Sequence, residues 1–460
     1  MKKKFCSRPF DFLHLDPNGG VRICSWSDEK IGDLLKEDLE DIWNGEQADK
    51  IRESIIDGSY KYCRATSCPY LENDSLPYIT EEEMKHKAVK KERPVNFNVA
   101  CDFTCNHSCP SCRDSVFVGD AAYKENLQTV IDKIIPYLNS ADTFSTCGNG
   151  DVFSSPQMFS MLERLQPEKE DLTISIETNG ALFDEQHWKK IEHLAKYKIR
   201  VAVTPNSFEP KTFKYLNGGH NTYDKVIQNL YFMRDLRRKG LISFLEISMV
   251  MQDRNFWELP EFVERCLNDF EADMVTVKPL YHWFGLSEDM YWYKDVLNPK
   301  HPYHKEYLEM IEAPILNDER VFFWGAKNLH KEQEHPAYRY KEYLTIVTKL
   351  LEMEDSEEKI KNYFEKLNAS SIYIYGDTEL SIILCRILDK AVPVRSFIAR
   401  DTDKESICGK PVLRLCEYES EKEDVVLVLN YHFFKNIKRD LDFRGFKGRA
   451  VGLDQFINEL

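Results

Sequence analysis

The stretch that decides the fold class reads Cys105-Asn106-His107-Ser108-Cys109-Pro110-Ser111-Cys112 and sets three cysteines in a C-x3-C-x2-C spacing. Three thiolates this close in sequence can bind three irons of one cubane cluster with little loop-closure cost. The fourth iron then has no protein ligand, and an open metal position is typical of a catalytic site. If Cys101 supplied a fourth sulfur, the site would be closed and structural. The sequence alone leaves both arrangements open.

β-rich runs alternate with amphipathic helical runs from Pro94 to about Leu280, and the cysteine triplet follows the first of these runs. This order predicts parallel strands joined by helical crossovers. Six strand–helix units predict an α/β fold with a partial (β/α)6 TIM-like barrel over residues 94–285, whose chemistry lies at the carboxyl ends of its strands. The expected strands cover 95–100, 143–147, 172–177, 199–204, 244–250 and 274–278, and the expected helices cover 127–138, 157–165, 186–194, 223–236 and 257–267.

A second organised set of cysteines, Cys6, Cys24, Cys63 and Cys68, precedes the expected barrel. The first two flank an expected hairpin with strands at 12–15 and 21–23. Apolar residues then recur at helical spacing from 34 to 56, with a break at Asn44-Gly45, and the other two cysteines follow in a loop. These features predict a small cysteine-rich module over residues 1–80. Four cysteines can saturate one iron–sulfur cluster or one zinc ion, and both remain open.

The β/α alternation returns near the carboxyl end, with expected strands at 371–375, 392–398, 412–415, 424–429 and 450–453 and a helix at 380–388. This order predicts a Rossmann-like domain over residues 368–460, with a linker or helical region at 286–367 before it. The first turn starts at Gly376, but acidic and hydroxyl side chains replace the other two glycines of a dinucleotide site. Docking or structural support is therefore the preferred role for this domain.

Length and charge limit the classes of partner. A chain of 460 residues fits several domains. Its 62 Lys and Arg against 77 Asp and Glu give a net charge of −15, which disfavours nucleic acid as a partner. No run of 18 apolar residues occurs and no apolar signal follows the basic start, so we expect a cytoplasmic protein without membrane contact. Thirteen cysteines in such a chain are better explained by metal ligation than by disulfides.

The cysteine triplet and the β/α order over residues 95–280 resemble the radical S-adenosylmethionine (SAM) superfamily. The resemblance implies a catalytic [4Fe-4S] cluster on Cys105, Cys109 and Cys112, with SAM bound at the open iron and cleaved to a 5′-deoxyadenosyl radical. Two departures stand out: Ser111 replaces a usually aromatic residue, and Asn217 stands where an arginine often precedes paired glycines. Residues at expected strand ends that match SAM-contacting positions of the family are Gly148, Gly150, Asp151, Asn179, Thr204 and Asn206.

The N-terminal module resembles a SPASM or twitch auxiliary-cluster module, which usually follows the barrel instead of preceding it. The resemblance implies a second iron–sulfur cluster, expected to be [4Fe-4S], on the four module cysteines. Together the two resemblances imply an oxidoreductase-like radical enzyme that takes electrons from a low-potential flavodoxin- or ferredoxin-type donor. The implied substrate is a peptide or a sugar related to cell-surface glycans. The competing function is a non-catalytic zinc- or iron–sulfur-binding protein for docking or redox sensing.

Overall fold

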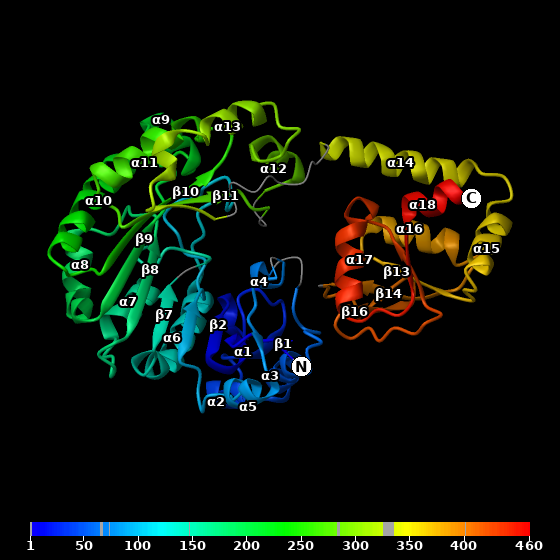
Figure 1. Cartoon of the computed structure of the whole chain (residues 1–460), viewed down its shortest axis with the longest axis horizontal. Helices are drawn as coiled ribbons and strands as arrows, with labels where there is room; N and C mark the ends of the chain where they lie inside the picture. Colours follow the sequence, from blue (N-terminus) through cyan, green and yellow to red (C-terminus); the bar gives the residue numbers. More distant parts are fainter. Residues whose placement is uncertain are drawn as a thin grey trace.

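The computed structural model describes residues 2–64, 68–72, 74–146, 148–282, 286–324, 335–400 and 402–460. The chain forms one ten-stranded sheet, one six-stranded sheet and a two-stranded ribbon. Figure 1 shows the large sheet and its helices on the left, the six-stranded sheet on the right, and the N-terminal module between and below them. In the described ranges, every helix is too short or too polar to span a bilayer.

The large sheet has the order β12-β11-β10-β9-β8-β7-β6-β2-β3-β4. Its central six strands pair in parallel, each with its neighbour in the chain. The parallel α/β arrangement predicted from the sequence is thus confirmed, although residue 147 of the second expected strand lies outside the described residues. The six strands are β6 (Asn96–Val99), β7 (Thr143–Thr146), β8 (Thr173–Thr178), β9 (Lys198–Val203), β10 (Phe244–Met251) and β11 (Met274–Pro279).

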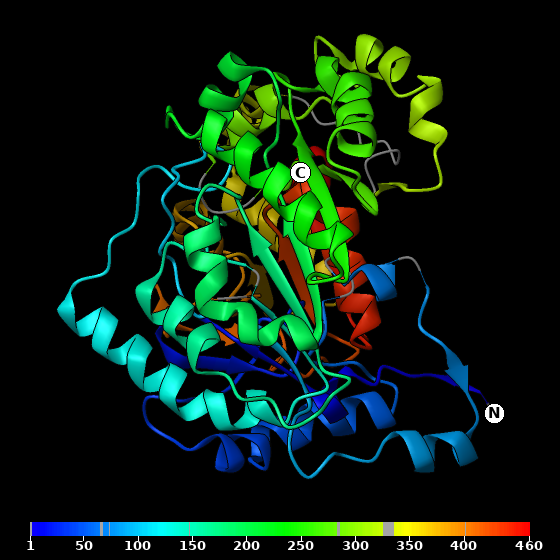
Figure 2. The ribbon, with the colours of Figure 1, turned by 90° about the vertical axis from the view of Figure 1, so that its left-hand side faces the viewer.

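Helices cover one face of this sheet, as Figure 2 shows from that side. The strand pattern explains the choice of face. Ile174, Ile176 and Val201 are fully buried in the core shared with the helices, whereas Glu177 and Arg200 on the opposite face are exposed. The uncovered face is therefore polar. The helices are α6 (Ala121–Asn139), α7 (Pro156–Arg164), α8 (Glu185–Ile191), α9 (Pro210–Leu216), α10 (Tyr223–Arg238) and α11 (Leu259–Asn268).

The N-terminal module is joined to the large sheet by backbone pairing. The expected hairpin is confirmed as β2 (Phe12–Leu15) and β3 (Gly20–Arg22), with β4 (Lys30–Asp33) beside it. Strand β2 runs parallel to β6, so the module extends the sheet of the central domain. The other elements are β1 (Lys3–Lys4) paired with β5 (Tyr78–Ile79), α1 (Arg8–Asp11), α2 (Leu39–Trp43), α3 (Glu46–Ile56), α4 (Pro69–Glu72) and α5 (Glu81–Lys87).

A strand that the sequence pattern did not predict follows the central strands. Strand β12 (Val321–Phe323) pairs in parallel with β11 and continues the sheet at the edge opposite the module. Three residues are too few to show a period-two alternation, which is why the pattern gave no signal. This region also holds α12 (Glu288–Lys294), α13 (His304–Met310), α14 (Pro336–Glu352) and α15 (Ser356–Lys366).

The six-stranded sheet at the carboxyl end has the order β15-β16-β14-β13-β17-β18. Five of its strands pair in parallel, as predicted, and only the short β15 is antiparallel. A separate apolar core forms between this sheet and its helices. The elements are β13 (Ile372–Tyr375), α16 (Glu379–Leu388), β14 (Val394–Ala399), β15 (Ser406–Ile407), β16 (Lys410–Arg414), β17 (Val425–Val428), α17 (Phe434–Phe443), β18 (Arg449–Gly452) and α18 (Leu453–Glu459).

Candidate functional site

The three clustered cysteines lie in the loop between β6 and α6. Cys105 and Cys109 are half-buried, whereas Cys112 is exposed. Side chains of the segment before α10 hold this loop: Thr222 Oγ1 lies 2.8 Å from His107 Nε2, and His220 Nε2 lies 3.1 Å from Ser108 Oγ. The loop therefore presents three free thiols at the carboxyl end of the first parallel strand, where the sequence placed them.

Arg113 supplies a positive charge beside these thiols. It donates hydrogen bonds to the carbonyl oxygens of Phe103 and Asn149, and its Nη2 lies 3.7 Å from Cys112 Sγ. Burial raises the pKa of the Cys109 thiol to about 12, and the charge of Arg113 acts against that shift. Sequence reasoning did not single out this residue, although its place directly after Cys112 was a usable signal.

The loop after β7 packs tightly against the cysteine loop through glycine. A side chain on Gly150 would bring its Cβ to 2.5 Å from the Thr104 carbonyl oxygen and 2.7 Å from that of Asp102. Only glycine fits such a close approach of two backbones. Gly148 has φ = +132°, and its missing Cβ would lie 2.7 Å from the Ala100 side chain. Both predicted glycines therefore lie where the chain has no room for a side chain.

Asp151 connects the loops after β7 and β8. Its buried carboxylate accepts hydrogen bonds from Thr178 Oγ1 at 2.8 Å, from the Asn179 N–H at 2.7 Å and from the Phe153 N–H at 3.0 Å. Burial raises the pKa of this carboxyl group, and the hydrogen bonds act in the other direction. The side chain thus fixes the position of two strand-end loops.

The three remaining predicted SAM contacts divide into two groups. Asn179 belongs to the cysteine site, because its Nδ2 donates to Asn106 Oδ1 at 2.8 Å and lies 3.7 Å from Cys105 Sγ. Thr204 and Asn206 make their contacts with β10 instead. The Thr204 hydroxyl lies 2.7 Å from Ser248 Oγ, and Asn206 Oδ1 accepts a hydrogen bond from the Val250 N–H at 2.9 Å.

The four module cysteines line one cavity, an open space of about 510 Å³. Arg8, Tyr60 and Arg64 also line it. The Trp26 N–H points to Cys24 Sγ at 3.4 Å, a contact that a thiolate would strengthen. Burial raises the pKa of the Cys6 thiol to about 12 and raises that of Cys63 as well. In the described ranges, no three His, Cys, Asp or Glu side chains gather closely enough to hold a single metal ion.

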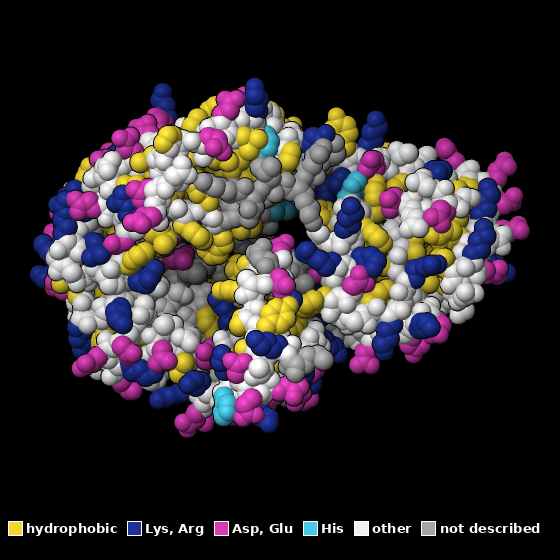
Figure 3. Space-filling model, in the orientation of Figure 1, with side chains coloured by type: hydrophobic (Ala, Val, Ile, Leu, Met, Phe, Trp, Pro, Cys, Tyr) yellow, Lys and Arg dark blue, Asp and Glu magenta, His cyan; other side chains and the backbone are white. Residues whose placement is uncertain are grey.

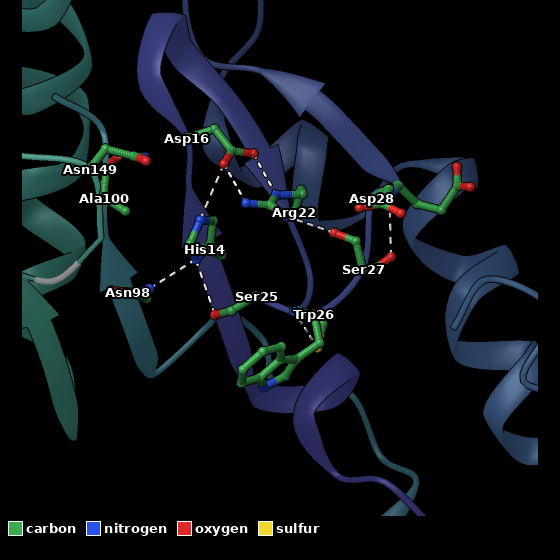
Figure 4. Close-up of polar contacts among 12 residues, drawn as sticks. His14, Asp16, Arg22, Ser25, Trp26, Ser27, Asp28, Asn98, Ala100 and Asn149 are labelled. Carbon is green, nitrogen blue, oxygen red and sulfur yellow. Dashed lines mark hydrogen bonds and ion pairs between the residues drawn. The ribbon is translucent and has the colours of Figure 1, made fainter. Parts of the chain in front are cut away.

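A polar network joins the module to the central sheet (Figure 4). His14 of β2 lies between Asp16, Ser25 and Asn98, with Nε2 3.2 Å from Asp16 Oδ1 and Nδ1 3.1 Å from Ser25 Oγ. Asn98 Oδ1 accepts a hydrogen bond from Ser145, so its amide donates to His14 Nδ1 at 3.0 Å. This leaves the His14 proton on Nε2, facing Asp16. Sequence reasoning found no partner set for this histidine.

Both cysteine sites fit iron–sulfur clusters by their donors. One offers three thiols in a single loop with a glycine cradle beside it, and the other offers four thiols around one cavity.

Comparisons with known families agree with this geometry. Residues 103–266 match the family model of the radical SAM superfamily, and residues 6–69 match that of SPASM, an iron–sulfur cluster-binding domain. No curated protein matches the chain.

Three similar solved structures are two of SuiB from Streptococcus suis and one of methylornithine synthase (PylB). SuiB bound to S-adenosylmethionine is 15% identical, covers 66% of this chain and 67% of its own, and gives a TM-score of 0.35. SuiB bound to precursor peptide SuiA is 14% identical, with 74% and 75% covered and a TM-score of 0.35. PylB is 11% identical, with 79% and 85% covered and a TM-score of 0.29.

The two family matches contain the two cysteine sets described above. The first spans Cys105, Cys109 and Cys112, and the second spans the four cysteines of the N-terminal module. The chain therefore carries a radical SAM domain, which supports an enzyme of the radical SAM class with a [4Fe-4S] cluster and S-adenosylmethionine, and before it a SPASM iron–sulfur cluster-binding domain over residues 6–69.

Proposed function

We propose that Cys105, Cys109 and Cys112 hold the SAM-binding cluster and that the chain acts on a peptide. When bound there, the cluster and SAM would supply the radical chemistry of the superfamily. The observation that carries this proposal is the contact of Asn179 with Cys105 and Asn106, together with the hydrogen bonds of Asp151 to Thr178 and Asn179. Loops after three neighbouring parallel strands thereby meet at one edge of the sheet, where a ligand would bind.

The uncovered face of the large sheet supports a charged substrate. The register places Glu177, Ala202 and Glu246 in one row of this face. Arg200 lies two residues before Ala202, and Lys278 lies four residues after Met274, the partner of Glu246, so both project from the same face. Figure 3 shows this part of the molecule as a hollow. Charges of both signs on this face can pair with the ammonium and carboxylate groups of a peptide.

The N-terminal module is proposed to hold an auxiliary [4Fe-4S] cluster on Cys6, Cys24, Cys63 and Cys68. The four thiols line one cavity, yet they do not gather at one point in the described structure. One zinc ion would draw all four sulfurs to about 2.3 Å from a common centre, whereas a cubane binds each sulfur to a different iron. The match of residues 6–69 to an iron–sulfur cluster-binding domain supports a cluster over the zinc alternative.

The proposed domain plan keeps the boundaries expected from the sequence. The module covers residues 1–80, a (β/α)6 TIM-like half barrel covers 94–285, and a Rossmann-like domain covers 368–460. The region 286–367 contributes β12 to the edge of the barrel sheet and α14 and α15 to the connection. The electron donor is proposed to be a flavodoxin- or ferredoxin-type protein.

The test is reductive SAM cleavage by protein purified without oxygen. We expect two clusters by iron and acid-labile sulfide content, and 5′-deoxyadenosine on addition of SAM and a low-potential reductant. Cys109→Ala should abolish this product, whereas Cys266→Ala, a buried cysteine on α11, should not. Peptide mixtures should raise the rate of product formation more than nucleotide-sugar mixtures. Zinc without acid-labile sulfide, or equal product from Cys109→Ala, would refute the proposal.

A further inference from the structure

The carboxy-terminal domain packs against the N-terminal module directly beside the auxiliary-cluster cysteines. Phe443 at the end of α17 packs against the small apolar core of the module, as Cys6 and Cys63 also do, and its ring centroid lies 6.1 Å from that of Tyr60. The next residue, Arg444, donates a hydrogen bond from Nη2 to the Cys63 carbonyl oxygen at 3.1 Å. Figure 1 shows α17 on the side of its domain that faces the module.

Five arginines lie at or beside this interface, and four of them have carboxylate partners. Arg64 lies 2.9 Å from Asp28, Arg414 lies 2.7 Å from Glu29, Arg400 pairs with Asp440, and Arg439 lies 3.7 Å from Glu72. The fifth, Arg444, forms no ion pair with any described residue, and its buried Nη1 has no hydrogen-bond partner among them. Among these five, Arg444 is therefore the one whose guanidinium no described carboxylate pairs.

This arginine lies in a poor environment for an uncompensated cation. The Nη1 of Arg444 is buried without a partner in the described part of the chain, and its Nη2 hydrogen-bonds a backbone carbonyl oxygen instead of a carboxylate. A buried charge is costly unless a charge of opposite sign lies near it. An anion bound at Cys63 would supply the opposite charge that Arg444 lacks.

We propose that Arg444 is a positioning residue through which the carboxy-terminal domain covers the auxiliary cluster and raises its reduction potential. The inference rests on the ligand set proposed above. Four thiolates outweigh the positive charge of the iron–sulfur core, so the bound cluster is an anion, and one added electron increases that negative charge. A fixed cation beside a ligand residue stabilises the reduced form more than the oxidised form.

The experiment measures the auxiliary cluster alone. Changing Cys105, Cys109 and Cys112 together to Ala removes the other cluster, and EPR-monitored redox titration of the oxygen-free protein then gives the midpoint of the remaining one. Arg444→Gln removes the charge, and Arg444→Lys keeps it. Arg439→Gln is the matched control, because Arg439 lies on α17, which ends one residue before Arg444, and its charge is already paired with Glu72 at 3.7 Å on the surface.

The expected result is a more negative midpoint in Arg444→Gln, with most of the shift reversed in Arg444→Lys and no shift in Arg439→Gln. The same midpoint in Arg444→Gln and the parent protein, with iron and sulfide content unchanged, overturns the inference. Equal shifts in the Gln and Lys variants also overturn it, since they would show a structural effect without charge dependence. A parent protein without iron and sulfide refutes instead the ligand set of the proposed function, and the inference with it.

Discussion

The paired glycines after α9 give a sharp test of how the cysteine loop is held. Gly218 and Gly219 both have positive φ, +76° and +85°. A Cβ on Gly218 would overlap the Ser108 carbonyl oxygen and lie 2.6 Å from its carbonyl carbon, whereas a Cβ on Gly219 would meet nothing within 4 Å. Ser108 lies between Cys105 and Cys109, so only one of these two neighbours is in contact with the cluster loop.

Gly218→Ala and Gly219→Ala should therefore differ in their free energy of unfolding by a predictable amount. A left-handed backbone costs a non-glycine residue about 1–2 kcal/mol, and both variants bear this cost. Overpacking against a fixed backbone adds about 1–3 kcal/mol for Gly218→Ala alone. We expect Gly219→Ala to lower the free energy of unfolding by about 1–2 kcal/mol and Gly218→Ala by about 2–5 kcal/mol.

Urea denaturation of the cluster-free protein, followed by circular dichroism, measures the stability difference. Iron and sulfide content then reports on the cluster, in a background where Cys6, Cys24, Cys63 and Cys68 are changed to Ala so that only the SAM-binding cluster is counted. Gly218→Ala should lose iron and Gly219→Ala should keep it. If both variants had the same unfolding free energy and the same iron content, the close contact with Ser108 would not exist in solution.

Two further predictions concern the buried polar groups of the site. Asp151→Asn places an amide NH2 toward the Thr178 hydroxyl or the Asn179 N–H, so it should lower the free energy of unfolding by about 1–3 kcal/mol, measured by denaturation. It should also weaken SAM binding, measured by SAM titration of the cluster-loaded enzyme. Unchanged SAM affinity would contradict the positioning role of Asp151. Burial lowers the pKa of His14 from its ordinary 6.5, so the unfolded chain takes up this proton more readily than the folded chain. The stability that neutral His14 contributes is therefore present above that value and is lost as the pH falls below it. His14→Gln should remove this part of the pH dependence of the urea midpoint, while the control His86→Gln on the exposed helix α5 should retain it. Identical pH profiles for the unaltered protein and both variants would count against the buried network.

Much of the fold was predictable because its signals are local. Each of the six central strands was placed within one or two residues, since period-two burial in strands and a 3.6-residue period in helices are read from neighbouring positions. The hairpin around Asp16 to Gly20 was equally clear, because turn residues separate its two strands. The break between α2 and α3 at Asn44 and Gly45 was predicted for the same reason.

The candidate site was predictable only where its residues are close in sequence. The three cysteines of the first site span eight residues, so their spacing alone indicated a shared metal group. Asp151 was selected as a SAM contact, but its bonds to Thr178 and Asn179 depend on the register of β7 against β8. The partners of His14 were missed, because Asn98 lies 84 residues away and reaches it only through the pairing of β2 with β6.

The sequence by itself determined the two cysteine sets, the parallel order of the strands and the class of chemistry, because each depends on spacing along the chain. Only the tertiary structure decided that the N-terminal hairpin joins the central sheet and that Arg444 meets Cys63 across 381 residues. The physical reason is that such contacts depend on which sheet edges and domain surfaces remain uncovered after each unit has folded. Local periodicity in the sequence does not indicate which of these edges and surfaces remain uncovered.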